Sequence, residues 1–221
     1  METKLNEIHQ YLIEKGSHEE ELKNMDTQSV YLSMEIMEYA HRNQKRENGE
    51  DYANHPWRCS KNYRNLVGIG PEEHFCIDSD LMWKNGIPFQ GVQELCYLHD
   101  VLEDSELTFD DVQNIFFECG FEGYFNLYIA APLKNITHIK TMDYLSYILI
   151  CMEHPTSALV KMLDMQDNIN IFSLASFEKE KFVRSSNYLS YMYLINDKYH
   201  FIENIQNYLG EFKGTLKIKQ D

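Results

Sequence analysis

The sequence is poor in residues that interrupt helices, with only five prolines and ten glycines among 221 residues. No proline- or glycine-rich linker therefore divides it. It also lacks a run of about 18 apolar residues, which a membrane span needs, and its first residues lack the apolar core of a signal peptide. Positive charge is scarce, since 20 Lys and Arg face 35 Asp and Glu for a formal net charge of -15. This acidity repels nucleic acid and anionic membranes, and we expect neither as a partner.

Cysteine pairs are missing as well. The five cysteines are an odd number, lie far apart and form no CxxC motif, which excludes a disulfide framework and a zinc ribbon. We expect reduced thiols and a cytoplasmic protein. The length fits one domain over residues 1–221, and the sequence leaves its oligomeric state open.

Apolar residues recur mainly at helical spacing, and the alternation typical of strands is scarce. A first helix is expected from Asp26 to about Gly49, with His41 on its apolar face. A second helix begins after Pro88 and directs His99 inward. Further helices are expected at 108–120, 144–152, 157–170, 177–195 and 202–209. The pattern predicts an all-α helical bundle.

One segment departs from this periodicity. Residues 57–90 contain several glycines and prolines and little helical spacing, so we expect an irregular insertion or loop between the first and second of these helices. Such a segment is typical of a lid or a specificity loop.

Four residues on three of the expected helices suggest a metal site. These residues are His41, His99, Asp100 and Asp164. Two imidazoles and two carboxylates form a mixed N/O set that suits a divalent ion such as Mn, Fe or Zn. Glu103 lies one helical turn after His99, where it can orient or deprotonate a metal-bound water.

Three stretches of sequence resemble one family. HRNQKRENGEDYANHP, which starts at His41, is similar to the H-x-x-Q-x-R-x-x-G-x-x-Y-x-x-H-P stretch of the RelA/SpoT-type HD hydrolase domain. LHDVLEDSELTFDDV, from Leu98, resembles that family's H-D-x-x-E-D followed by a Thr-capped helix. VKMLDMQDNI, from Val160, is similar to the family's K-L-A-D-x-x-x-N segment.

The resemblance implies an all-α HD-domain bundle that binds one divalent metal ion, usually Mn²⁺. It implies that the metal is bound by His41, His99, Asp100 and Asp164, and that Glu103 and Asp104 assist the attack. The implied reaction removes the 3'-pyrophosphate of guanosine tetra- or pentaphosphate, (p)ppGpp. A protein of this kind acts on a small nucleotide substrate.

An anionic substrate also needs cations near the metal. Arg46 and Lys161 are the expected phosphate contacts, because both lie within the three stretches. Asn168, four residues after Asp164, is expected to bond a sugar hydroxyl or a base. His55, before Pro56, fits two roles equally, one in ending a helix and one in lining the pocket.

Two alternatives remain open. Met165, Gln166 and Asp167 stand where the family commonly has Arg and His, which favours an HD nucleotidase or pyrophosphatase acting on another nucleotide. A catalytically silent HD domain that binds a nucleotide or a partner protein is the second alternative. The presence of Glu103 and Asp104 argues against it, because binding alone does not need them.

Tyrosines are numerous, and several of them gather near the C-terminal end of the sequence at Tyr188, Tyr191, Tyr193 and Tyr199. We expect an amphipathic helix that packs on the bundle, in preference to a platform on which a nucleotide base stacks.

Overall fold

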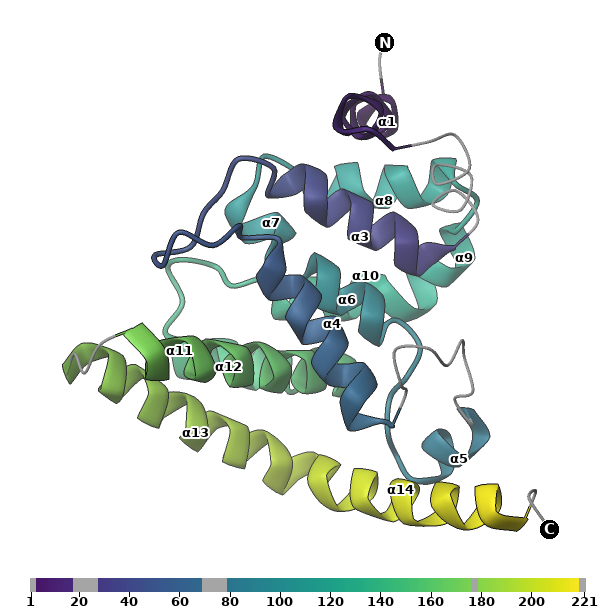
Figure 1. Cartoon of the computed structure of the whole chain (residues 1–221), viewed down its shortest axis with the longest axis vertical. Helices are drawn as coiled ribbons and strands as arrows, with labels where there is room; N and C mark the ends of the chain where they lie inside the picture. Colours follow the sequence, from purple (N-terminus) through teal and green to yellow (C-terminus); the bar gives the residue numbers. More distant parts are fainter. Residues whose placement is uncertain (1–2, 18–27, 69–78, 176–178, 219–221) are drawn as a thin grey trace.

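The structure is a computed structural model that describes residues 3–17, 28–68, 79–175 and 179–218, and every regular element within these ranges is helical (Figure 1). A single isolated bridge joins Lys45 to Asp51 in these ranges. The elements are α1 (Lys4–Lys15), α3 (Ser29–Ala40), α4 (Asn54–Leu66), α5 (Ser79–Lys84), α6 (Val92–Leu98), α7 (Val101–Asp104), α8 (Phe109–Glu118), α9 (Glu122–Tyr124), the π-helix η1 (Phe125–Ile129), α10 (Ala130–Ile136), α11 (Tyr144–Cys151), α12 (Pro155–Ala175), α13 (Lys179–Tyr199) and α14 (Phe201–Ile218). The predicted all-α class is confirmed.

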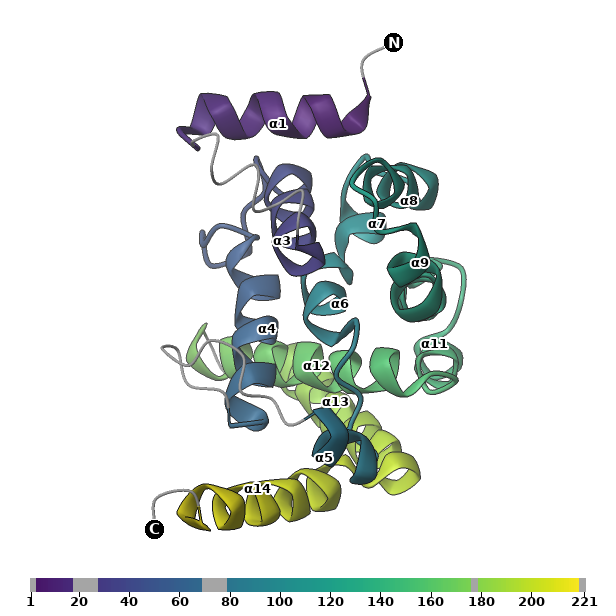
Figure 2. The same ribbon diagram turned by 90° about the vertical axis from the view of Figure 1, so that its right-hand side faces the viewer.

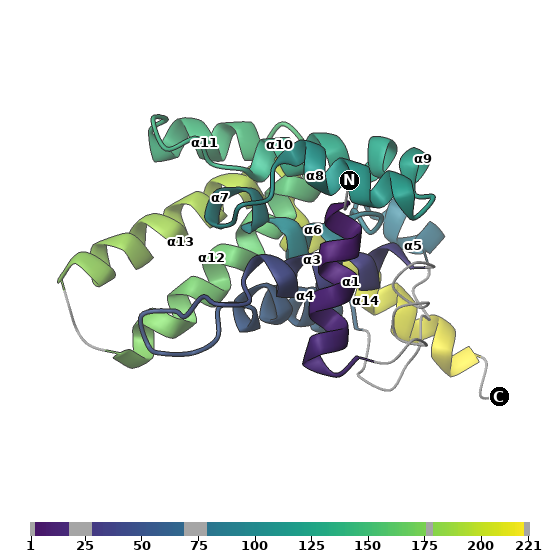
Figure 3. The same ribbon diagram turned by 90° about the horizontal axis from the view of Figure 1, so that it is seen from above.

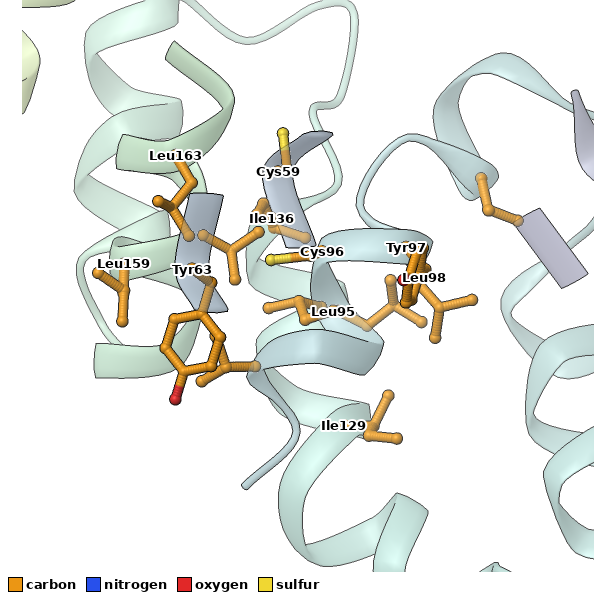
Figure 4. Packing of buried hydrophobic residues seen from close by; sticks show 14 of the residues in the cluster. Cys59, Tyr63, Leu95, Cys96, Tyr97, Leu98, Ile129, Ile136, Leu159 and Leu163 are labelled. Atoms are coloured by element: carbon orange, nitrogen blue, oxygen red, sulfur yellow. The ribbon is translucent and has the colours of Figure 1, made fainter. Parts of the chain in front are cut away.

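Helix α6 lies at the centre of the bundle. It packs against α3, α4, α10 and α12. Figure 2 shows it beside α3 and α4 and above α12. Five of its seven side chains are apolar, and six of the seven, Glu94 included, are buried. Figure 4 shows this core, in which Leu95 and Cys96 meet Tyr63 of α4 and Leu163 of α12. The core thus surrounds the segment that leads into His99.

The remaining helices enclose this centre. Seen from above, α1 crosses over α3 (Figure 3), and it also contacts α8. Helices α13 and α14 follow one another along the opposite side, where α5 rests on α14 (Figure 1). None of the described helices combines the length and the apolar character that crossing a membrane requires.

The first predicted helix ends earlier than expected. It stops at Ala40, with His41 as its C-cap, and not near Gly49. Residues 41–53 form a loop stabilised by backbone hydrogen bonds such as Arg46 N to Glu50 O at 2.8 Å, and Gly49 in this loop has a φ of +85°. The apolar periodicity ends at His41, because the polar run that follows has no apolar face to bury. The predicted start at Asp26 lies outside the described residues.

The prediction of an irregular segment at 57–90 is wrong for its first part. Helix α4 extends to Leu66, and its side chains at His55, Cys59 and Tyr63 are buried one turn apart. Pro56 lies in the first turn, where its missing N–H costs nothing. Residues 79–84 form α5, and residues 69–78 lie outside the described ranges.

The other predicted helices are present, with altered boundaries. The helix after Pro88 is interrupted at His99 and Asp100, which separate α6 from α7. The expected Thr cap of α8 is confirmed: the Thr108 hydroxyl accepts from the Asp111 N–H, and the Asp111 side chain accepts from the Thr108 N–H at 2.8 Å. The break between α6 and α7 places the adjacent side chains of His99 and Asp100 side by side.

Candidate metal centre

Four elements converge on one buried cluster of imidazoles and carboxylates. His41 caps the C-terminal end of α3, His55 lies in the first turn of α4, and His99 with Asp100 joins α6 to α7. Asp164 projects from α12. The helices bring these residues together because α6 packs on α3 and α4, and α12 packs on α4 and α6.

The hydrogen bonds of the three histidines fix their tautomers. His41 Nδ1 lies 2.8 Å from Gln44 Oε1, and Gln44 Nε2 donates to the Asp104 carbonyl, which orients the amide. His99 Nδ1 lies 2.8 Å from the Cys96 carbonyl. His55 Nδ1 lies 2.7 Å from an Asp167 carboxylate oxygen.

Each of these partners can only accept at that point, so each Nδ1 carries a hydrogen. In the neutral form the second ring nitrogen, Nε2, therefore has a free lone pair. His41 Nε2 is buried and has no hydrogen-bond partner. The three imidazoles are thus oriented as metal ligands usually are, with Nδ1–H tied to an acceptor.

Three of the four predicted ligands are within contact distance of one another. His99 Nε2 lies 3.2 Å from Asp100 Oδ2 and 3.8 Å from Asp164 Oδ1. The Asp164 carboxylate is 4% exposed and also accepts from Lys161 Nζ and from Asn168 Nδ2, both at 2.6 Å. The structure therefore brings the predicted residues of α6 and α12 to one point.

The fourth predicted ligand, His41, is next to this group. Its ring stacks on Tyr52 with 4.6 Å between the centroids, and the Tyr52 hydroxyl lies 2.9 Å from Asp100 Oδ2 and from Asp104 Oδ2. Burial is the main reason that the pKa of the Tyr52 hydroxyl is raised, and the nearby carboxylates of Asp100 and Asp104 raise it further. Tyr52 thereby remains a neutral hydrogen-bond donor to the carboxylates.

Charges inside the cluster shift its protonation. Burial lowers the pKa of His41 below its ordinary value. Burial acts in the same direction on His99, but Asp100 and Asp164 outweigh it and raise its pKa to about 9. Burial opposes ionisation of the two carboxyls, yet His99 beside Asp100 and Lys161 beside Asp164 hold both pKa values below the usual range. The cluster favours bound positive charge.

Among the described residues, a potential metal-ligand atom of His55 lies within 4.8 Å of one of Cys59 and one of His99, and these two atoms are equally close to each other. Cys59 Sγ lies 4.0 Å from His55 Nδ1, the ring nitrogen already bonded to Asp167. Burial raises the pKa of the Cys59 thiol well above its ordinary value, and only the thiolate binds metal well. Asp100 and Asp164 lie on the other side of the His55 ring, 3.6 and 3.0 Å from its Nε2.

The two predicted catalytic acids are at the edge of the cluster. Glu103 accepts a hydrogen bond of 2.6 Å from the His138 backbone N–H, and burial raises its pKa to about 7. Asp104 faces Tyr52, as described above, and its carbonyl accepts from Gln44. Glu103 is thus the acid whose pKa is suited to proton transfer near neutral pH.

The predicted substrate contacts also gather at this site. Arg46 Nη2 donates to Asn168 Oδ1 at 2.6 Å, while Arg46 Nη1 is buried without a hydrogen-bond partner. Lys161 is 8% exposed, pairs with Asp164, and lies over the Tyr147 ring at 4.9 Å. Asn168 uses both ends of its amide to join Arg46 to Asp164, so within the protein it positions Arg46.

Several residues of the site were not assigned from the sequence. Gln44 and Tyr52 orient His41, and both are matched positions of the motif that begins there, which was the available signal. Asp167 appeared only as an added negative charge, whereas the structure pairs it with His55 and with Arg58, whose Nε lies 2.7 Å from Asp167 Oδ1. Arg58 and Asp167 are 109 residues apart in sequence, and no local sequence pattern predicts that they pair.

The tyrosines of α13 behave mainly as expected. Tyr188 and Tyr191 pack on Tyr144 of α11 with ring centroids 6.0 and 5.3 Å apart. Tyr199 stacks on Phe201 at 5.0 Å, and Tyr193 is exposed. Packing on the bundle is therefore the observed role of most of this group.

Comparisons with known proteins bear on the fold. No family model and no curated protein matches the sequence. A solved structure that is similar is that of a metazoan ortholog of SpoT, described as hydrolysing ppGpp and playing a role in starvation responses. The TM-score is 0.51 at 17% identity, over 83% of this chain and 94% of that one. At this identity the likeness shows the fold alone, an all-α bundle like that of the SpoT ortholog.

Proposed function

We propose that the chain is a metal-dependent phosphohydrolase whose divalent ion is bound by His41, His99, Asp100 and Asp164. One observation carries the proposal. Imidazole nitrogens and two ionised carboxylates share a buried cluster, and the buried Nε2 of His41 has no hydrogen-bond partner. An orphaned buried nitrogen is costly, and a metal ion would satisfy it. Mn²⁺ is the proposed ion, on the strength of the family resemblance.

When bound, such an ion polarises a phosphoryl oxygen and lowers the pKa of water toward about 7. The residues of the chain would accept the proton and hold the ligands in place. Glu103 has one carboxylate oxygen fixed by the His138 N–H and a pKa of about 7, so it can take a proton from an attacking water. Tyr52 keeps Asp100 and Asp104 in place through its hydroxyl. No protein nucleophile is required.

Arg46 supports an anionic substrate, because its guanidinium lies at the site. Its Nη1 makes no hydrogen bond and lies 3.8 Å from Asp167 Oδ2, and Asn168 fixes the other end of the same group. A rigid guanidinium of this kind suits a phosphate oxygen. Lys161, beside Asp164, adds a second cation close to the cluster. These residues support a phosphate or pyrophosphate ester as the bond that is cleaved.

Guanosine tetra- or pentaphosphate is the leading substrate within this proposal. The resemblance of three sequence stretches to RelA/SpoT-type hydrolase domains supports it, as does the fold shared with a SpoT ortholog described as hydrolysing ppGpp. The added acid at Asp167 weakened that assignment at the level of sequence. In the structure Asp167 pairs with Arg58 and His55, which offsets its negative charge, so this acid no longer argues against ppGpp as the substrate.

The test is a nucleotide panel with Mn²⁺, comprising ppGpp, GTP and nucleoside mono- and diphosphates. Release of pyrophosphate from ppGpp is expected. Glu103→Gln should lower turnover by about 10²–10⁴-fold because it removes the proton acceptor, while the bound metal remains. Glu118→Gln, which changes an exposed acid on α8, is the matched control.

Other outcomes select among the alternatives. Hydrolysis of another nucleotide alone would replace ppGpp as the substrate and keep the enzyme class. Binding of metal and nucleotide without turnover, unchanged by Glu103→Gln, would identify a silent HD domain and contradict the proposal.

A further inference from the structure

Lys161 and the tyrosines around it form an arrangement that the proposed function leaves unexplained. We propose that Lys161 is a positioning residue that keeps Asp164 Oδ2 occupied. Asp164 then offers only Oδ1 to the metal ion, and a coordination position stays open for water. This inference rests on the metal ion of the proposed function.

The two oxygens of the Asp164 carboxylate have different surroundings. Lys161 Nζ donates to Oδ2 at 2.6 Å. Oδ1 lies 3.8 Å from His99 Nε2, a second proposed ligand, and accepts from Asn168 Nδ2 at 2.6 Å. Lys161 lies three residues before Asp164 on α12, and this spacing places both side chains on one face of the helix. The contact between them is therefore set by α12 alone.

The Lys161 ammonium has little freedom to leave Asp164. Lys161 is 8% exposed, and its Nζ lies 4.9 Å from the centroid of the Tyr147 ring and 5.7 Å from that of Tyr144. A cation within about 6 Å of a ring centroid is attracted to the ring, more strongly where water is excluded. We call these two rings the tyrosine cage. Because a buried ammonium without a paired anion is costly, the caged cation stays on Asp164.

The tyrosine cage is itself fixed by its neighbours. Tyr147 is 2% exposed, and its hydroxyl donates to the Ile136 carbonyl. Tyr144 packs against Tyr147 with 5.6 Å between the ring centroids, and against Tyr191 of α13 with 5.3 Å. The tyrosines of α11 and α13 thus hold the cation that in turn holds one proposed ligand.

The number of oxygens that Asp164 gives to the ion decides how much room is left. A carboxylate binds through one oxygen or through both, and the second oxygen takes up a further position. Four ligands of one atom each leave about two of the roughly six coordination positions of Mn²⁺. With Oδ2 tied to Lys161, binding through both oxygens would break a charge-assisted hydrogen bond. The pairing therefore keeps a position available for the attacking water.

Other roles of Lys161 make different predictions. If Lys161 contacted the phosphate directly, the role expected from the sequence, its removal would raise KM and leave kcat and the number of coordinated waters unchanged. If the pair with Asp164 were only structural, its removal would lower the melting temperature and leave the waters of the loaded protein unchanged. A positioning role predicts that a water is lost, while Mn²⁺ affinity stays equal or increases because a nearby cation is removed.

The experiment counts waters on bound Mn²⁺ by electron paramagnetic resonance in ¹⁷O-enriched water, together with Mn²⁺ affinity. The full chain is compared with Lys161→Met, which removes the donor, and with Lys161→Gln, whose amide still donates a hydrogen bond. Lys61→Met is the matched control, because Lys61 is exposed and its Nζ also lies over a ring, that of Trp57, at 5.3 Å. Neither readout requires turnover.

The wild type should show about two coordinated waters. Lys161→Met should lose about one of them and bind Mn²⁺ equally well or more tightly, while kcat for the hydrolysed nucleotide falls about 10–100-fold. Lys161→Gln should keep the wild-type number of waters. Lys61→Met should match the wild type in every measurement.

An unchanged number of waters in folded Lys161→Met would overturn the inference and leave the metal site intact. Fewer than about two waters in the wild type would also overturn it, and this count decides the matter even if Lys161→Met fails to fold. Absence of Mn²⁺ from the wild type would overturn the proposed function as well, so the two failures are distinguishable.

Discussion

At the scale of single residues, the account depends on protons and a metal ion competing for the same nitrogens. His99 has a pKa raised to about 9 by Asp100 and Asp164 against the effect of burial. At neutral pH the metal-free protein therefore carries a proton on this ring. A metal ion must displace that proton before it can bind.

This competition predicts a pH dependence of metal affinity. The apparent Mn²⁺ affinity should rise about tenfold per pH unit between pH 6 and 8, and level off near the His99 pKa of about 9. The sign follows because a raised pKa keeps His99 protonated until higher pH. Calorimetric titration in two buffers of different ionisation enthalpy would measure both the affinity and the protons released. Binding that is independent of pH, with no proton release, would contradict the assignment of His99 as a ligand.

Sequence patterns predicted which residues form the cluster more successfully than they predicted which residues contact one another. The predicted ligands His99, Asp100 and Asp164 meet in the structure, because helical spacing directs each toward the interior. The pairing of Asp167 with His55, 112 residues apart in sequence, could not be predicted. Local spacing fixes which face a residue occupies, whereas the partner on another helix is set by packing.

At the scale of elements, the sequence indicated most helices and misplaced their ends. Helix α3 was expected to continue to Gly49, but the apolar stripe stops at His41. Helix α4 was missed because residues 57–90 were treated as one irregular segment on account of their glycines and prolines, all of which follow Leu66, the last residue of the helix. The error at α3 arises at a helix terminus, where capping and tertiary contacts outweigh periodicity.

Gly91, which precedes α6, offers a test of how this element is positioned. Its φ is +74°, and a Cβ there would lie 2.5 Å from the Tyr128 carbonyl oxygen in the π-helix. Gly91→Ala should therefore destabilise the fold by more than the roughly 1–2 kcal/mol of left-handed strain alone, because the backbone of η1 or α6 must move. Urea unfolding is the measurement.

Gly120→Ala is the matched control, since Gly120 has a φ of +81° and no atom within 4 Å of an added Cβ. Gly120→Ala should lower the free energy of unfolding only by the left-handed backbone strain. Equal losses in the two variants would show that the contact between Gly91 and Tyr128 does not constrain the position of α6.

At the scale of the whole molecule, stability should depend on Glu94, a buried acid outside the candidate metal centre. Glu94 of α6 is 3% exposed and accepts from the Ser29 hydroxyl at 2.6 Å. Burial raises its pKa, and the hydrogen bonds from Ser29 and Tyr124 offset this only in part. Glu94 thus links α3 and α9 to the central helix while favouring its neutral form.

A carboxyl with a raised pKa in the folded state stabilises the fold fully below its unfolded pKa of about 4.3, and this stability is lost as pH rises through the folded pKa. Glu94→Gln should therefore raise the melting temperature relative to wild type at pH 8 and change it little at pH 4. Glu118→Gln, on the surface, should change it at neither pH. A Glu94→Gln variant less stable at pH 8 would show that the charged carboxylate is the stabilising form.

The central claim is that the buried cluster is a metal site at which a nucleotide phosphate ester is hydrolysed. The most direct measurement is to load wild type and Asp100→Ala with Mn²⁺, then determine metal content by mass spectrometry and pyrophosphate release from ppGpp on the same samples. The account predicts about one metal ion and pyrophosphate release for wild type, and neither for Asp100→Ala. A wild type that binds no metal, or an Asp100→Ala variant that hydrolyses ppGpp equally well, would contradict it.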